Sequence, residues 1–180
     1  KWSESSDLEN YDEIRLLKKM PIGCALSESE NTVYFCEKFE EKIKIYRLDL
    51  FKNQLTGKWY AMPFNRLELI SVFNLEGVFL DFCLLNDEII LFEIVNKKIK
   101  VNKLIGSKWI NLSTHSTNEK IDIIDSTSNG KEVFFLVRKN QQGLILSYKN
   151  NLWETKNIRG DLPDQIVSVG KSLAFARSVN

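Results

Sequence analysis

The sequence alternates short apolar runs with clusters of polar, turn-forming residues. The runs are rich in Val, Ile, Phe and Tyr, which is the composition of β-strands. One pattern occurs three times: an apolar run, a second apolar run ten to twelve residues after the start of the first, and then Trp. The copies begin at Val33, Ile89 and Val133. Internal repetition at this scale predicts a series of like-built units, such as propeller blades.

The spacing within the copies supports a common four-stranded unit. From run start to Trp the distance is 20 residues in the second and third copies, and the first copy carries its extra residues in the loop 51–56. A further apolar run precedes each copy across a polar turn, at 23–27, 78–85 and 121–125. The middle runs are almost continuously apolar, as in strands buried on both faces, whereas the third runs alternate, as in half-buried strands. Predicted burial therefore decreases along each unit toward a last strand that begins with Trp. This decrease favours a propeller blade arranged radially around an axis.

We therefore predict an all-β fold, a β-propeller or a contiguous segment of one, with a two-layer sandwich as the alternative. About three full four-stranded blades are expected, with partial blades at both ends. The predicted divisions of the single domain 1–180 are an outer strand and connector, three blades and the first strands of a further blade: 1–19, 20–64, 65–113, 114–160 and 161–180.

The two ends of the chain suggest how such a segment is completed. Trp2 stands where a Trp-led outer strand is expected, and 165–169 and 173–179 resemble the first two strands of a further unit. Residues 7–19 form the one helix-like stretch. Either Trp2 joins the C-terminal strands in a shared blade, or the chain is part of a propeller with about six to eight blades. The absence of an initiator Met favours the second.

The stretch Gly57-Lys58-Trp59-Tyr60-Ala61-Met62-Pro63, with Trp leading the outer strand, resembles the repeat of kelch-like β-propellers. The Gly-Gly pair of kelch repeats and the Gly-His and Trp-Asp pairs of WD40 repeats are absent. The four tryptophans are predicted to be structural repeat positions, since a large ring at one repeated position fills the wedge between neighbouring sheets: Trp2, Trp59, Trp109 and Trp153. The alternative is stacking on sugar rings, as in lectin-type propellers.

The charge balance argues against a nucleic-acid partner. Lys and Arg number 25 against 24 Asp and Glu, and the pI is near 7.8, whereas phosphate binding usually requires a basic surface. No apolar run is long enough to span a bilayer. The three cysteines, Cys24, Cys36 and Cys83, lie among apolar residues, which predicts small buried side chains in a reducing, intracellular compartment. The alternative is a Cys24–Cys36 bridge in a secreted or cell-surface protein. In such a protein the sequon at Asn111 would be a site for N-glycosylation.

The residues needed for most catalysis are absent or scattered. His115, the one histidine, lies in a polar segment predicted to be a solvated loop between units. Neither a zinc-ligand pattern nor a glycine-rich phosphate loop occurs, so we expect no metal and no cofactor. Asp81, Asp122 and Asp125 fall on or beside the first strands of their units, and two carboxylates suffice for glycoside hydrolysis.

From these observations we predict a non-catalytic protein–protein interaction scaffold, part of a larger propeller or complex and not an enzyme. Its partner would be another protein or the remainder of the same protein. The first alternative is a glycan-binding, lectin-like propeller, which exposed Trp side chains or a Cys24–Cys36 bridge would support. The second is a carboxylate-based hydrolase, which requires paired acids in a pocket.

Overall fold

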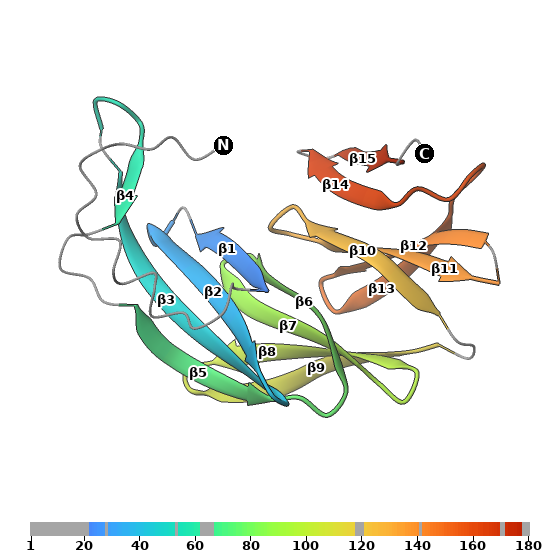
Figure 1. Ribbon diagram of the computed structural model, residues 1–180, viewed down its shortest axis with the longest axis horizontal. Coiled ribbons are helices and arrows are strands. Elements are labelled where there is room, and N and C mark those ends of the chain that lie inside the picture. Colours follow the sequence, from blue (N-terminus) through green and yellow to red (C-terminus); the bar gives the residue numbers. More distant parts are fainter. Residues whose placement is uncertain are drawn as a thin grey trace. The chain divides into compact units, whose positions relative to one another are not determined.

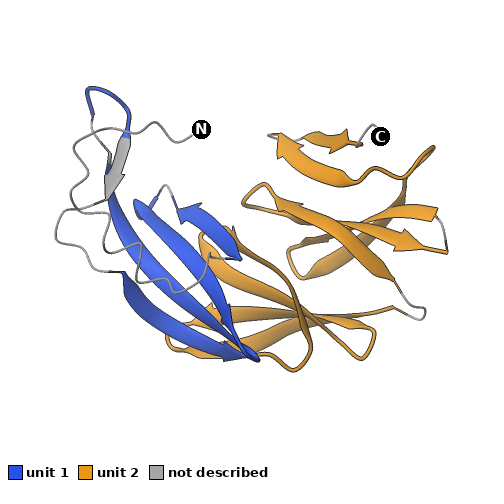
Figure 2. Ribbon diagram, in the orientation of Figure 1, with its two compact units in different colours: residues 1–74 blue, residues 75–180 orange. Residues whose placement is uncertain are grey.

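The computed structural model describes residues 22–177, apart from 28, 53, 62–66, 118–120, 141 and 170–171. These residues form β-strands joined by turns, without a helix among them. The chain divides into two compact units, residues 1–74 and 75–180 (Figure 2). The predicted strand at Trp2, the helix-like stretch 7–19 and the last residues of the predicted final strand lie outside the described part.

The described residues of unit 1 form one antiparallel sheet, in which the long strand β3 has two partners on one side. Its strands are β1 (Gly23–Ser27), β2 (Thr32–Phe39), β3 (Lys42–Lys52), β4 (Trp59–Ala61) and β5 (Glu68–Asn74). The end of β3 pairs with the short β4, and its first half pairs with β5. Residues 68–74 therefore complete the first sheet, although the sequence assigned them to the second blade. The eleven residues of β3 leave room for both partners, and burial of Ser71 and Phe73 holds β5 in register.

Unit 2 contains three antiparallel sheets that follow one another along the chain (Figure 1). The first is β6 (Val78–Leu85), β7 (Glu88–Val95), β8 (Lys98–Ile105) and β9 (Lys108–Ser116); the second is β10 (Asp122–Ser128), β11 (Val133–Lys139), β12 (Gln142–Lys149) and β13 (Leu152–Asn157); the third is β14 (Gln165–Val169) and β15 (Ser172–Ala176). Each strand pairs with the next within its sheet. Strand β9 runs to Ser116, three residues past the predicted blade boundary at 113.

The hairpins are short because turn residues adopt left-handed backbone angles. Asn86 and Asp87, Asn96 and Lys97, and Asn150 and Asn151 have positive φ in pairs, between 48° and 63°. Two successive residues with positive φ are typical of type I′ turns, whose twist matches that of the flanking strands. Asn tolerates this region better than most residues. The many asparagines of this chain therefore allow strands to follow each other after two residues.

The sheets of unit 2 stack face to face around a shared apolar core. The core joins side chains from β6, β7 and β8 to side chains from β11 and β12, with Phe92 and Phe135 fully buried at its centre. The first strands are neighbours: β10 contacts both β6 and β14. Four-stranded antiparallel sheets stacked with adjacent first strands are the arrangement of propeller blades. The prediction of an all-β, blade-based fold is confirmed.

Candidate functional site

An aromatic cluster fills the interface between the two four-stranded sheets of unit 2. The rings of Phe92 and Phe135 meet edge to face with centroids 5.1 Å apart, and Tyr148 lies 5.8 Å from Phe92. The ring of Trp153 lies 5.0 Å from Tyr148 and 4.9 Å from His115. These centroid distances fall in the range where aromatic pairs attract beyond their buried area. The aromatic contacts therefore hold the two sheets together, from β7 and β9 on one side to β11, β12 and β13 on the other.

Trp153 belongs to this interface as a packing residue. Its indole Nε1 donates a hydrogen bond of 3.2 Å to Ser113 Oγ of the preceding sheet, and its ring packs against the core. Trp109 is half-buried as the second residue of β9, opposite Leu104. Trp59 begins β4, and Trp2 lies outside the described residues. A shared structural role for the four tryptophans stays a prediction, with Trp153 the example whose contacts are known.

His115 lies inside strand β9 and not in the predicted solvated loop. Leu112 has no partner across β8, because Val101 pairs with Ser113 and Asn102 pairs with Asn111. This bulge shifts the alternation by one residue, so that Ser113 and His115 lie on the same face as their partners Val101 and Ile99 and face the neighbouring sheet. His115 is half-buried, and burial lowers the pKa of its imidazole. The ring is therefore uncharged at neutral pH and can both donate and accept a hydrogen bond.

A cavity of about 170 Å³ opens beside this cluster, between the two sheets. We call its aliphatic lining residues the floor; they come from the position just before β10 and from β11 and β12. Its rim carries hydroxyl, imidazole and ammonium groups from the end of β9 and from β11 and β13. The lining residues are Ile121, Val137, Leu144 and Leu146 on the floor and His115, Ser116, Thr117, Lys139 and Thr155 on the rim.

Strand alternation explains why these particular residues line the cavity. Residues two apart on a strand share a face, so Val137 places Lys139 beside it, and Leu146 lies opposite Thr155 in the register of β12 and β13. Thr117 is held just beyond β9, where its N–H and hydroxyl both donate to the Lys97 carbonyl oxygen, at 3.0 and 2.6 Å. The rim is thus built from regular strand positions and one anchored turn.

Of these residues, the sequence singled out His115 alone as a candidate. Lys139 and Thr155 look like ordinary exposed positions near strand ends, because alternation shows which residues share a face but not which sheet covers that face. The repeat itself could have indicated that these residues lie near one another. Aligned copies place the ends of β9, β11 and β13 at the same edge of adjacent units, where a gap between sheets would collect their side chains.

The predicted carboxylates are only partly brought together. Asp81 on β6 and Asp125 on β10 lie at register shifts in equivalent first strands and interact. Asp125 accepts hydrogen bonds from its neighbour Ser126 N (2.9 Å) and from Ile166 N of β14 (2.8 Å). Asp122 is exposed at the start of β10, opposite Arg138. Asp125 therefore connects two first strands.

The Asp81 carboxyl is more easily protonated than an ordinary aspartate. Burial and the charge of Asp125 raise its pKa, against hydrogen bonds from Phe82 N and the Ser126 side chain that lower it. The pKa of Asp81 is raised, whereas the neighbouring Asp125 accepts hydrogen bonds from two backbone N–H groups. Acid–base catalysis uses pairs of carboxyl groups whose environments differ in this way.

The cysteines are not bridged. Cys24 pairs with Phe35 in the β1–β2 register and Cys36 with Gly23, so the two side chains point to opposite faces of the sheet. Cys36 and Cys83 are buried as predicted, but Cys24 is exposed. The bridge that would have supported a cell-surface protein is therefore not formed. Within the described residues, no group of three or more potential ligands is placed to hold a metal ion, and no apolar helix of membrane-spanning length occurs.

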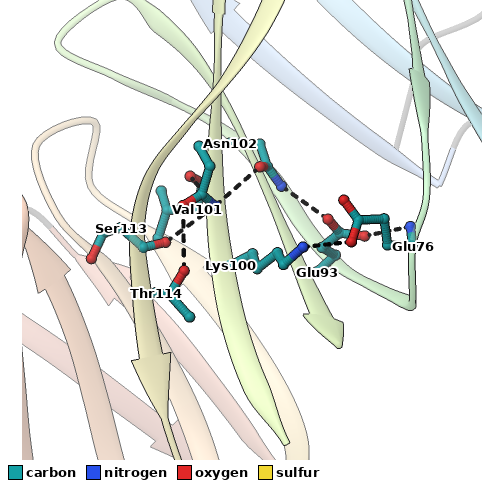
Figure 3. A network of polar contacts seen from close by, with 8 residues as sticks. Glu76, Glu93, Lys100, Val101, Asn102, Ser113 and Thr114 are labelled. Atoms are coloured by element: carbon teal, nitrogen blue, oxygen red, sulfur yellow. Dashed lines mark hydrogen bonds and ion pairs between the residues drawn. The ribbon is translucent and has the colours of Figure 1, made fainter. Parts of the chain in front are cut away.

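A second polar network lies across β7, β8 and β9 (Figure 3). The buried Glu93 accepts hydrogen bonds from Glu76 N at 2.9 Å and from Asn102 Nδ2 at 3.2 Å. Asn102 in turn accepts from Asn111, and Lys100 pairs with Glu76. Both oxygens of Glu93 are occupied by protein donors. The network therefore stabilises the sheet and leaves the cavity as the better candidate for a ligand.

No family model matches the chain, and no curated protein is significantly similar to it. Among solved structures, one similar protein is a GH43 glycoside hydrolase, engineered in its active site to display both endo-xylanase and exo-arabinofuranosidase activity. Its sequence identity is 13% and its TM-score is 0.47, and the match covers 83% of this chain and 33% of that chain. A protein from Lactobacillus plantarum has 11% identity and a TM-score of 0.41, with 76% and 55% covered. An uncharacterized protein from Listeria monocytogenes has 12% identity and a TM-score of 0.43, with 85% of this chain and 47% of that chain covered. The chain thus spans between a third and just over half of these proteins.

The comparison corrects the predicted function. The sequence favoured a non-catalytic protein-interaction scaffold, whereas the GH43 structure is that of a glycoside hydrolase. The scaffold hypothesis is therefore withdrawn. The kelch resemblance has no matching family model, and what remains of it is the propeller-like architecture. Structural similarity at such low sequence identity gives information about the fold alone. The function therefore has to be argued from the residues of the site.

Proposed function

We propose that the chain binds carbohydrate in the cavity between the two four-stranded sheets of unit 2. The observation that carries this proposal is the division of the lining into an aliphatic floor and a polar rim. A sugar ring presents C–H groups on its faces and hydroxyls around its edge, so it needs both kinds of surface at once. Small-molecule sites are generally of this kind, apolar with a few placed polar groups.

The size and chemistry of the cavity suit a single small ring. Its volume of about 170 Å³ lies below the ~300–1,000 Å³ of sites for drug-sized ligands. It therefore has room for one sugar unit, with any longer chain extending outward. Ser116, Thr117 and Thr155 carry hydroxyls that both donate and accept, as sugar hydroxyls do. The tryptophan nearby contributes by holding the sheets apart at a fixed distance, not by stacking on the ligand.

Removing the Thr155 hydroxyl is expected to weaken sugar binding about two- to tenfold, the usual effect of one neutral hydrogen bond. Thr155→Val keeps the shape of the side chain and the β-strand. The measurement is a titration of the whole chain with glucose, galactose, mannose, xylose and arabinose, by calorimetry and by saturation-transfer NMR.

The matched control is Thr114→Val, which removes a hydroxyl from the exposed Thr114 of β9, a residue that is not part of the lining. Its hydroxyl bonds Asn111 on its own strand. This variant should bind as the unchanged protein does. Absence of binding to every sugar in the panel, or equal weakening by both variants, would refute the proposal.

A second function, glycoside hydrolysis, is favoured by one specific observation. Burial raises the pKa of Asp81, which lies beside Asp125, and glycoside hydrolysis uses a pair of carboxyl groups of which one has a raised pKa. If these groups act together, the protein cleaves aryl glycosides, and Asp81→Asn lowers the rate by about a hundredfold or more. Asp122→Asn, a change at an exposed carboxylate on β10, the strand of Asp125, leaves the rate unchanged. A release assay with nitrophenyl glycosides decides the matter, because absence of turnover in the unchanged protein excludes hydrolysis of these substrates.

For the compartment, we propose an intracellular, reducing environment. The exposed Cys24 and the buried Cys36 and Cys83 form no disulfide, and cysteines stay unbridged where thiols are kept reduced.

A further inference from the structure

The turn between β10 and β11 contains an Asn-Gly step, Asn129-Gly130, and no other glycine in the sequence follows an asparagine. Both residues are exposed to solvent. Gly130 has a φ of 79°, a backbone angle that glycine adopts without strain. Because glycine has no side chain, its backbone nitrogen is open to the carboxamide of the preceding asparagine. This is the step at which asparagine loses its amide nitrogen most readily.

Hydrogen bonds hold the Asn129 carboxamide over the following peptide. Its Oδ1 accepts from Lys131 N at 3.0 Å and from Glu132 N at 2.9 Å. Asn129 N in turn donates to the Glu132 carbonyl oxygen at 3.1 Å, which closes the turn. An asparagine side chain that bonds the N–H groups two and three residues ahead curls back over the peptide between them. The carbon Cγ of Asn129 is therefore brought toward Gly130 N.

The same two donors favour attack on this carbon. Addition of Gly130 N to Asn129 Cγ moves negative charge onto Oδ1, at which two backbone N–H groups are already aimed, as in an oxyanion hole. One contact opposes the attack, since Gly130 N donates a hydrogen bond of 3.1 Å to Ser128 Oγ. A single neutral hydrogen bond slows a step by about tenfold at most, whereas one aligned oxyanion donor accelerates it by about a hundredfold or more. Activation therefore outweighs protection.

We propose that Asn129 is a site of spontaneous deamidation, which converts it to isoaspartate or aspartate. Gly130 N gives its proton to water or hydroxide and forms a bond to Asn129 Cγ. The bond from Cγ to Nδ2 then breaks, and the nitrogen takes up a proton and leaves as ammonia. Water opens the resulting succinimide, giving aspartate by attack at Cγ and isoaspartate by attack at the main-chain carbonyl carbon. Water is the co-reactant of both steps.

This modification would reach beyond the turn, because the turn contacts the preceding sheet. The Gly130 carbonyl oxygen accepts a hydrogen bond of 2.7 Å from Asn86 N, in the turn between β6 and β7. Isoaspartate routes the main chain through the side-chain carbon, which lengthens the turn by one atom and displaces Gly130. Deamidation should therefore break a contact between the two four-stranded sheets of unit 2.

Peptide mapping of the whole chain measures the reaction. The protein is incubated at mildly alkaline pH, where more of the backbone nitrogen is deprotonated, and is then digested with trypsin. Cleavage after Lys120 and Lys131 releases the peptide 121–131, in which Asn129 is the one asparagine. Mass spectrometry should show the mass gain of an NH2 group replaced by OH in this peptide. Labelling by a protein isoaspartate methyltransferase should identify the isoaspartate form.

The internal control is the peptide 150–156. Its Asn150 and Asn151 are also exposed turn residues with positive φ, but the residues that follow them are Asn and Leu. This peptide should stay unmodified over the time in which half of Asn129 reacts. As matched variants, Asn129→Gln should abolish the isoaspartate, since glutamine forms the larger ring slowly, and Asn151→Gln should leave the reaction at Asn129 unchanged.

Two further comparisons test the role of the folded turn. Because the two N–H donors are held in place by the fold, Asn129 should react at least as fast in the folded chain as in the chain unfolded in urea. The converted protein should unfold at a temperature about 2–4 °C lower than the fresh protein. Asn129→Gln incubated in the same way should keep its unfolding temperature.

Isoaspartate in the peptide 121–131, formed at least as fast in the folded chain as in urea, supports the inference. Absence of isoaspartate there, or a clearly slower reaction in the folded chain, overturns it. An unfolding temperature that does not change on conversion overturns the proposed effect on the contact between the sheets.

Discussion

Replacing Phe135 with alanine should lower the free energy of unfolding by about 3–5 kcal/mol. Phe135 is fully buried on β11 and contacts Phe92 of the preceding sheet and Trp153 of its own. Removing the ring takes away the buried apolar surface that joins two sheets and leaves a cavity that rigid strands cannot close. Urea unfolding followed by tryptophan fluorescence, to which Trp153 in the same cluster contributes, measures the change.

A phenylalanine outside the cluster provides the control. Phe175 on β15 has 46% of its surface exposed, so Phe175→Ala should change the free energy of unfolding by about 0.5 kcal/mol or less. A loss below about 1 kcal/mol for Phe135→Ala would contradict the view that this aromatic cluster holds the two sheets together.

Replacing Glu93 with alanine should lower the free energy of unfolding by about 2–4 kcal/mol. The side chain has 1% of its surface exposed, and its two oxygens accept from Glu76 N and Asn102 Nδ2 (Figure 3). Both donors would lose their acceptor. A buried donor such as Asn102 Nδ2 without a partner costs about 1–3 kcal/mol, and the partly buried Glu76 N adds to this loss. Denaturant unfolding monitored by circular dichroism gives the value.

The control for this prediction is a glutamate on the same strand. Glu88 pairs with Lys103 at the exposed start of β7, and a surface ion pair contributes about 0–1 kcal/mol. Glu88→Ala should therefore be nearly neutral. The account of Glu93 is wrong if the two variants lose the same stability, since burial is what distinguishes them.

The core and the cavity share residues, which links stability to binding. Val137, Leu144 and Leu146 belong to the apolar core and also form the floor of the cavity. Substitutions at these positions change both properties together. Rim residues such as Thr155 and Lys139 are the better probes of function, because they line the cavity but lie outside that core.

Much of the architecture follows from the sequence. Apolar runs separated by Asn- and Gly-containing turns place the strands of unit 2 close to their observed positions, because alternation and turn chemistry are local properties. The first sheet is where local reasoning failed. The sequence takes Trp59 as the head of a full outer strand, yet β4 has three residues and β5 supplies most of the pairing. Both segments pair with β3, β4 with its end and β5 with its first half, and the local pattern does not show that one long strand divides its edge between two partners.

The sequence by itself determined that this is a repetitive all-β chain, without zinc-ligand or phosphate-loop motifs and with little net charge. Tertiary structure alone decided that His115 lies in a strand facing Trp153, that Lys139 and Thr155 meet it at one cavity, and that Asp81 and Asp125 interact while Asp122 stands apart. The physical reason is the same in each case. Strand periodicity shows which side chains share a face, but only the stacking of one sheet on the next determines what that face meets.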